Sequence, residues 1–164
     1  MKKERYLKLY DAIEKRPRLR RTIETLNRAV TALVYAFYPL FLIFLLVKNQ
    51  TGWLRFLLVP YLSFVAVSFL RHRLNAQRPY EKFGVAPLVD KKTKGHSFPS
   101  RHTFSIFVIG FSTVAFLPNV GYAIVAMGVL LAACRVLLGL HFIRDVVAGF
   151  LCAAAAYLIG FILI

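Results

Sequence analysis

The sequence alternates long uncharged stretches with short basic connections. Ala29–Val47 and Val146–Ile164 each contain 19 residues without a charge, and Phe56–Leu70 is a third apolar stretch, which Trp53 and Leu54 extend at its start. A helix of 19 residues is about 28 Å long, close to the thickness of bilayer hydrocarbon. Each of these stretches is therefore predicted to span a membrane.

The longest uncharged stretch, Thr103–Cys134, has 32 residues, which is too many for one crossing. Pro118, Asn119 and Gly121 interrupt it near the middle, and proline and glycine are residues that end helices. This break predicts two spans here and five in total. Because helices satisfy their own backbone polar groups in lipid, we expect an all-α integral membrane protein, a bundle of five transmembrane helices.

The first 28 residues have a different pattern. Apolar side chains recur there at helical spacing between basic residues, at Tyr6, Tyr10, Ile13, Leu19, Ile23 and Leu26. The pattern predicts an N-terminal amphipathic helix that lies in the membrane interface on anionic lipid, and the alternative is a solvated basic tail. We therefore divide the chain into a basic membrane-surface segment, residues 1–28, and a transmembrane domain, residues 29–164.

Composition narrows the class of protein. Hydrophobic residues make up 59% of the chain and charged residues 18%, with a mean hydropathy of +0.62, which excludes an ordinary water-soluble domain. The 22 basic residues outnumber the 7 acidic ones, so phosphate-bearing partners are expected. Lipid is favoured over nucleic acid, because no recognisable nucleic-acid module accompanies the charge. The two cysteines, Cys134 and Cys152, lie in apolar stretches and predict no disulfide framework.

The basic residues also predict an orientation. With five spans, 20 of the 22 fall on one side of the membrane, and only Lys48 and Arg55 fall on the other. The excess of positive charge in cytoplasmic loops places the crowded side, with the loop around Lys91 and Lys92, in the cytoplasm. We expect a multi-pass protein of the plasma membrane.

Three short motifs share that crowded side. They are Arg71-(six residues)-Arg78-Pro79, then Pro99-Ser100-Arg101-His102, then Arg135-(five residues)-His141-(three residues)-Asp145. Each motif alone is weak evidence, but their order and their position at the ends of spans make the combination specific.

This combination resembles the type 2 phosphatidic acid phosphatase family, membrane lipid phosphatases related in their site to vanadium haloperoxidases and bacterial acid phosphatases. The resemblance covers about residues 56–160. The chain departs from the family pattern in three places, with Arg71 for Lys, Arg101 for Gly and Cys134 for Ser, and its five predicted spans are one fewer than is common. None of the three changes removes a residue that performs bond or proton chemistry.

The resemblance implies a role for each motif residue. His141 is the nucleophile that forms a phosphohistidine, Asp145 fixes its tautomer, and His102 is the acid and then the base. Arg71, Arg78 and Arg135 are expected to bind substrate phosphate, with Ser100 as a hydroxyl donor, and we add Arg101, the extra cation of this chain, to the phosphate-binding residues. Phosphoryl transfer independently requires such groups, because it needs cations around the equatorial oxygens, an in-line nucleophile and a proton donor. No metal or other cofactor is expected.

The expected reaction is hydrolysis of a lipid phosphomonoester of the phosphatidylglycerophosphate or phosphatidic acid type, with the substrate entering sideways from the lipid. A polyprenyl diphosphate is the alternative substrate. Two histidines and an aspartate could instead ligate zinc, but three converging arginines argue against a divalent cation. Outside the enzyme class, the alternative is a lipid-binding or lipid-moving protein, against which the intact His102, His141 and Asp145 argue. The oligomeric state is not predicted.

Overall fold

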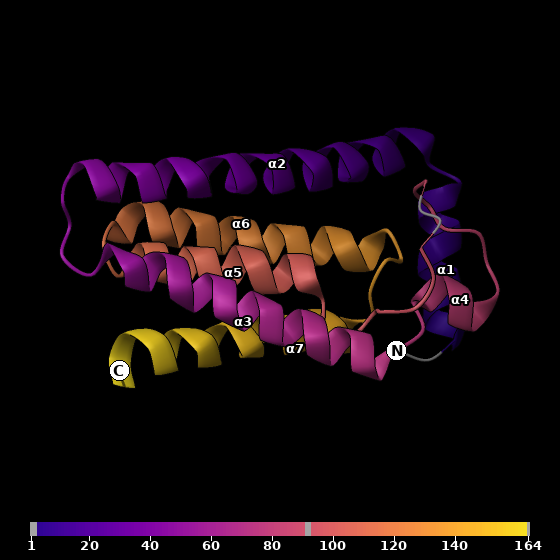
Figure 1. Ribbon diagram of the computed structural model, residues 1–164. Coiled ribbons are helices and arrows are strands. Elements are labelled where there is room, and N and C mark those ends of the chain that lie inside the picture. The colour runs from indigo at the N-terminus through magenta and orange to yellow at the C-terminus, as the bar shows by residue number, and fades with distance from the viewer. Residues whose placement is uncertain (1–2, 91–92, 164) are drawn as a thin grey trace.

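The computed structural model describes residues 3–90 and 93–163, and these residues form helices and connecting loops without a strand. The all-α prediction is therefore confirmed. The helices, shown in Figure 1, are α1 (Lys3–Glu14), α2 (Pro17–Val47), α3 (Trp53–Leu74), α4 (Pro79–Phe83), α5 (Arg101–Val114), α6 (Pro118–Leu137), α7 (Ile143–Tyr157) and a terminal π-helix (Leu158–Leu163). Lys91 and Lys92, which entered the orientation argument, lie outside the described residues.

The long helices run side by side along one axis (Figure 1). Four segments are long and apolar enough to cross a membrane, namely Pro17–Val47, Trp53–Phe83, Pro118–Leu137 and Ile143–Leu163. Helix α5 has 14 residues, or about 21 Å, which is shorter than bilayer hydrocarbon. The count of five spans therefore stays a prediction, although the expected break before α6 lies at Pro118.

Helix α5 forms the centre of the bundle. Phe104 and the four consecutive residues Ile106 to Ile109 are all buried. Because consecutive residues point to different faces of a helix, the protein surrounds α5 on all sides. It packs closely on α6, where a Cβ placed on Gly121 would lie 2.3 Å from the backbone nitrogen of Val114. The surrounding helices expose large apolar side chains, as expected of a surface that faces lipid tails.

The N-terminal segment differs from the expected single surface helix. Pro17 starts α2, because proline suits the first turn of a helix, and α2 continues without interruption through Arg28 to Val47. The predicted boundary after residue 28 therefore falls inside a helix. The apolar face of α1, with Tyr6, Tyr10 and Ile13, is buried against the protein rather than left for lipid. Binding of residues 1–28 to the membrane surface remains a prediction.

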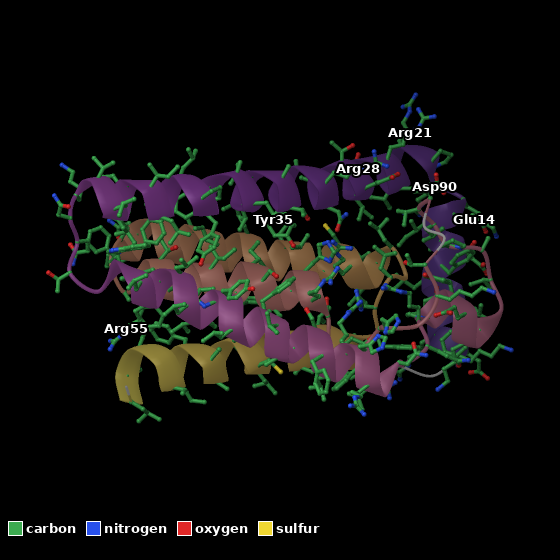
Figure 2. All side chains as sticks on the ribbon, viewed as in Figure 1. Glu14, Arg21, Arg28, Tyr35, Arg55 and Asp90 are labelled. Carbon is green, nitrogen blue, oxygen red and sulfur yellow. The ribbon has the colours of Figure 1, made fainter. Side chains whose placement is uncertain are left out.

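One end of the bundle collects the connections that carry the three motifs. Helices α1 and α4 and the loop before α5 cover this end, whereas the opposite end holds the turn between α2 and α3 (Figure 1). Glu14, Arg21, Arg28 and Asp90 lie toward the covered end and Arg55 lies near the other (Figure 2). The candidate site is therefore built at one membrane face from the ends of several helices.

Candidate active site

His141 lies in the tight turn between α6 and α7. Gly139 has a φ of +67°, a backbone conformation that glycine adopts freely, and the backbone N–H groups of Leu140 and His141 donate to the carbonyl of Arg135. A Cβ on Gly139 would lie 2.5 Å from the Tyr6 hydroxyl, so this turn needs glycine for space as well. The turn places the His141 side chain, 1% exposed, at the start of α7.

Asp145 lies one helical turn beyond His141 and is fully buried. Its Oδ2 is 3.6 Å from His141 Nδ1 and accepts a hydrogen bond of 2.9 Å from the backbone N–H of Phe142. The spacing of four residues and the first turn of α7 thus bring the carboxylate to the histidine ring, as the third motif predicts.

Ser97 completes this arrangement, and the sequence reasoning missed it. Its hydroxyl donates a 2.6 Å hydrogen bond to Asp145 Oδ2 and lies 3.4 Å from His141 Nδ1. The side chain has no exposed surface. The sequence offers one faint signal, because Ser97 lies two residues before the second motif begins at Pro99.

The environment of His141 keeps its imidazole neutral at physiological pH. The pKa of His141 is lowered to about 4: burial is the largest cause, Arg78 and Arg135 also lower the pKa, and Asp145 offsets part of the effect. Because Nδ1 faces Asp145 and Ser97, Nε2 is the ring nitrogen available to a ligand. A neutral imidazole held in this way can act as a nucleophile.

A cavity of about 320 Å³ adjoins His141. Five of the predicted site residues line it, namely Arg71, Arg78, Arg101, His102 and His141. The remaining lining residues are Ser68, His72, Thr93, Lys94, Gly95 and His96. We call this space the polar cavity.

Arg71 and Arg78 are buried in its wall and bonded to carbonyl groups. Arg71 Nη1 donates to the Pro99 carbonyl at 2.7 Å. Arg78 donates from Nε to the Gly95 carbonyl and from Nη1 to the Leu140 carbonyl, both at 3.0 Å. Carbonyl oxygens are neutral, so both guanidinium groups keep their positive charge for an anion.

Two predicted phosphate-binding residues lie outside the lining of this cavity. The Ser100 hydroxyl is buried and hydrogen-bonded to Thr103 at 2.9 Å, while the Ser100 backbone N–H donates to the Asp145 carbonyl. Arg135, in the last turn of α6, is 4% exposed, and its Nε has no hydrogen-bond partner among the residues described. The backbone therefore joins Ser100 to Asp145 and Arg135 to His141, but the Ser100 hydroxyl does not line the cavity.

Comparison with known proteins identifies the family of the chain. Residues 52–164 match the sequence model of the PAP2 superfamily. The chain belongs to the PAP2 superfamily. No curated protein sequence matches it. The PAP2 match begins at the end of the turn after α2, so helices α1 and α2 precede the matched region.

Two solved PAP2-like structures extend the likeness to those helices. LpxE from Aquifex aeolicus is 25% identical, with a TM-score of 0.73, and the alignment covers 94% of this chain and 93% of LpxE. A transmembrane PAP2-type phosphatidylglycerolphosphate phosphatase from Bacillus subtilis is 24% identical, with a TM-score of 0.56, and the alignment covers 94% of this chain and 90% of the other. The second likeness concerns the fold alone.

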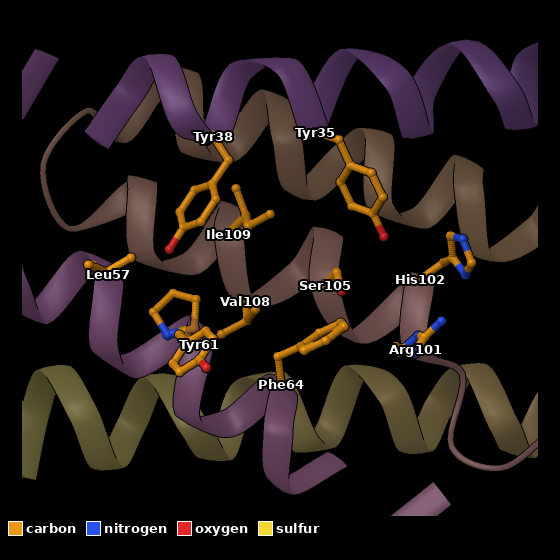
Figure 3. A pocket seen from close by; sticks show the side chains of 11 residues that line it. Tyr35, Tyr38, Leu57, Tyr61, Phe64, Arg101, His102, Ser105, Val108 and Ile109 are labelled. Atoms are coloured by element: carbon orange, nitrogen blue, oxygen red, sulfur yellow. The ribbon is translucent and has the colours of Figure 1, made fainter. Parts of the chain in front are cut away.

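His102 connects the polar cavity of this PAP2 chain with a second, apolar cavity. This apolar cavity has a volume of about 530 Å³, lies between α2, α3 and α5 (Figure 3), and is lined by Tyr35, Tyr38, Leu57, Pro60, Tyr61, Phe64, Arg101, His102, Ser105, Val108 and Ile109. The His102 ring stacks on Tyr35 of α2, with ring centroids 6.3 Å apart. His102, the predicted acid–base residue, thus contacts α2, a helix outside the matched PAP2 region.

The described part of the chain contains no cluster of metal-ligating side chains. Within residues 3–90 and 93–163, no three His, Cys, Asp or Glu side chains lie close enough together to hold a metal ion. The groups around the polar cavity are instead suited to binding an anion by positive charge.

Proposed function

We propose that this chain is a membrane-embedded lipid phosphatase that hydrolyses a phosphomonoester of the phosphatidylglycerophosphate or phosphatidic acid type. One observation carries the proposal. The hydrogen-bonded group Ser97–Asp145–His141 faces a cavity lined by arginines, and His102 joins that cavity to an apolar one. A phosphate and its attached lipid chain therefore have adjacent sites of matching chemistry.

In the first step, His141 Nε2 attacks phosphorus and the bond from phosphorus to the lipid oxygen breaks. His102 donates a proton to the departing alkoxide, which leaves as the lipid alcohol. Asp145 accepts the Nδ1 proton in a hydrogen bond and stabilises the positive charge that develops on the His141 ring. The product of this step is a phosphohistidine.

In the second step, water attacks phosphorus and the nitrogen–phosphorus bond breaks. His102, now neutral, accepts a proton from that water, and inorganic phosphate leaves. Both steps move negative charge over the phosphoryl oxygens, which Arg71 and Arg78 stabilise from the wall of the polar cavity. No metal ion is needed in this scheme, because guanidinium groups supply the positive charge.

Arg135 and Ser100 have supporting roles in this proposal. Arg135 has a buried Nε that no described residue hydrogen-bonds, so it is able to donate to a phosphate oxygen after a small side-chain movement. Ser100 binds the Asp145 carbonyl through its backbone and thereby connects the second motif to the third. We retain both among the phosphate-site residues together with Arg101.

The apolar cavity favours a lipid over a soluble phosphate ester. Aliphatic and aromatic side chains make up most of its lining, and it reaches Arg101 and His102 at one end (Figure 3). We propose that the lipid enters sideways and that the site faces the cytoplasmic leaflet, where the basic side is expected. A polyprenyl diphosphate is the alternative substrate.

The test is release of inorganic phosphate by purified protein in detergent. Wild-type protein should release phosphate from phosphatidic acid or phosphatidylglycerophosphate, whereas His141→Ala and His102→Ala should lose turnover and keep the wild-type helical content. Wild-type-like turnover by His141→Ala contradicts the phosphohistidine mechanism. Lipid binding by the wild type without phosphate release supports the non-enzyme alternative.

A further inference from the structure

The polar cavity holds more positive charge than one phosphoryl group requires. Four permanent cations line it, Arg71, Arg78, Lys94 and Arg101, and none of its described lining residues is Asp or Glu. A phosphomonoester carries a charge of about −1.5 to −2 at neutral pH, which the two buried arginines, Arg71 and Arg78, are sufficient to balance. Lys94 and Arg101 are both exposed, and their charges exceed what the transferred phosphoryl group alone requires.

The volume of the cavity leads to the same conclusion. A space of about 320 Å³ equals the volume of roughly ten waters at ~30 Å³ each, which is more than one phosphoryl group fills. Lys94, His72 and His96 also line this space, and the imidazole rings of the two histidines are stacked with centroids 5.3 Å apart. A second anionic group therefore has both space and counter-charge.

Arg101 lies where the polar and the apolar cavity meet, next to the expected position of a second anionic group. Its guanidinium lies 5.5 Å from the centroid of the Phe64 ring, a cation–π contact that restricts the side chain. Among the described residues, only Arg101 and His102 line both the polar and the apolar cavity. Figure 3 shows the two side chains together at one end of the apolar cavity.

We propose that Arg101, with Lys94, forms a subsite for a second phosphate group of the lipid substrate, next to the phosphoryl group that His141 accepts. This inference rests on the proposed function and narrows its substrate class to lipids with two phosphates. The planar guanidinium donates two parallel hydrogen bonds to phosphate oxygens, which a glycine at this position cannot do. The two phosphates are either adjacent, as in a polyprenyl diphosphate, or separated by glycerol, as in phosphatidylglycerophosphate.

The experiment compares kcat/KM for three lipids in one detergent: phosphatidic acid, phosphatidylglycerophosphate and a polyprenyl diphosphate. The variants are Arg101→Gln, Arg101→Lys and, as the matched control, Arg73→Gln. Arg73 also lies over an aromatic ring, with its guanidinium 4.9 Å from the Phe69 centroid, but it lines neither cavity. The control therefore removes an equal charge and the same kind of contact outside the proposed subsite.

We expect the wild type to prefer at least one two-phosphate lipid over phosphatidic acid by about tenfold or more. Arg101→Gln should lower kcat/KM for that lipid by about tenfold and for phosphatidic acid by less than about threefold, with partial recovery in Arg101→Lys. Arg73→Gln should leave all three values near those of the wild type. The identity of the preferred lipid decides between adjacent and separated phosphates.

Equal losses on all three lipids in Arg101→Gln overturn the subsite, because they assign Arg101 to the transferred phosphoryl group. Similar losses in Arg73→Gln also overturn it, because they indicate general attraction of anionic lipid to a basic surface. Failure of the wild type to release phosphate from any of the three lipids refutes the proposed function itself. Hydrolysis of phosphatidic acid alone retains the phosphatase and refutes the subsite.

Discussion

Replacement of Ser97 by alanine tests whether the buried polar group around His141 orients the nucleophile. The Ser97 hydroxyl donates to Asp145 Oδ2 at 2.6 Å and lies 3.4 Å from His141 Nδ1. Without it, Asp145 Oδ2 retains the Phe142 backbone N–H as a donor. The Asp145 carboxylate and the His141 ring then have one fewer constraint on their relative position.

The size of the effect follows from the kind of bond removed. A hydrogen bond to a charged group contributes about 1.5–3 kcal/mol, and each 1.4 kcal/mol in activation free energy changes a rate about tenfold. We therefore expect Ser97→Ala to lower kcat by about 10- to 100-fold. KM should change little, because Ser97 does not line the polar cavity.

The assay is steady-state phosphate release with Ser112→Ala as the matched control. Ser112 is also a fully buried serine, but its hydroxyl has no hydrogen-bond partner among the described residues and it lies in the last turn of α5. Ser112→Ala should keep the wild-type kcat. The reasoning is refuted by equal kcat values for the two variants, or by a Ser97→Ala loss confined to KM.

Three further measurements test the charge, protonation and orientation of the site. Activity should persist in excess chelator and be inhibited by vanadate, which adopts the five-coordinate geometry of the transferring phosphorus; loss on chelation that zinc restores supports the metal alternative. Because burial lowers the pKa of His141 to about 4, the unfolded state binds a proton between about pH 6.5 and 4 that the folded state does not. Thermal stability should therefore fall as pH drops through this range, and less so in His141→Gln. In a background without the native cysteines, Thr51→Cys should react with an impermeant thiol reagent in intact cells and Asp90→Cys should not; the opposite pattern reverses the predicted orientation.

The fold could be predicted from the sequence where one physical signal dominated. Uncharged length located α2, α3 and α7, and with the break at Pro118 it also located α6, because lipid imposes both an apolar surface and a minimum helix length. The N-terminal segment was harder, because an amphipathic pattern does not identify what covers its apolar face. Tyr6, Tyr10 and Ile13 have the predicted spacing, but they pack on the protein, and the basic residues 17–28 belong to the first turns of α2.

The candidate site shows a similar division between motif residues and supporting residues. The sequence correctly predicted that His141 and Asp145 lie close together, since four residues make about one helical turn. It also predicted that Arg71 and Arg78 lie at the same end of the bundle. It could not identify Ser97 or Tyr35. Their contacts join segments 44 residues or more apart, and short motifs carry no information at that distance.

Arg78, in the wall of the polar cavity, also holds the backbone next to His141, the proposed nucleophile. Arg78 Nη1 holds the carbonyl of Leu140, the residue before His141, while its Nε holds Gly95 in the loop that leads to Ser97. The Arg78 guanidinium therefore holds two backbone segments in place: the turn that carries His141 and the loop that carries Ser97. Any substitution of Arg78, including Lys, breaks at least one of these bonds, because an ammonium lacks the fork of donors. A loss of activity in such a variant combines weaker phosphate binding with displacement of His141. The Ser97 variant, which leaves every cation in place, isolates the orientation of the nucleophile from the binding of its substrate.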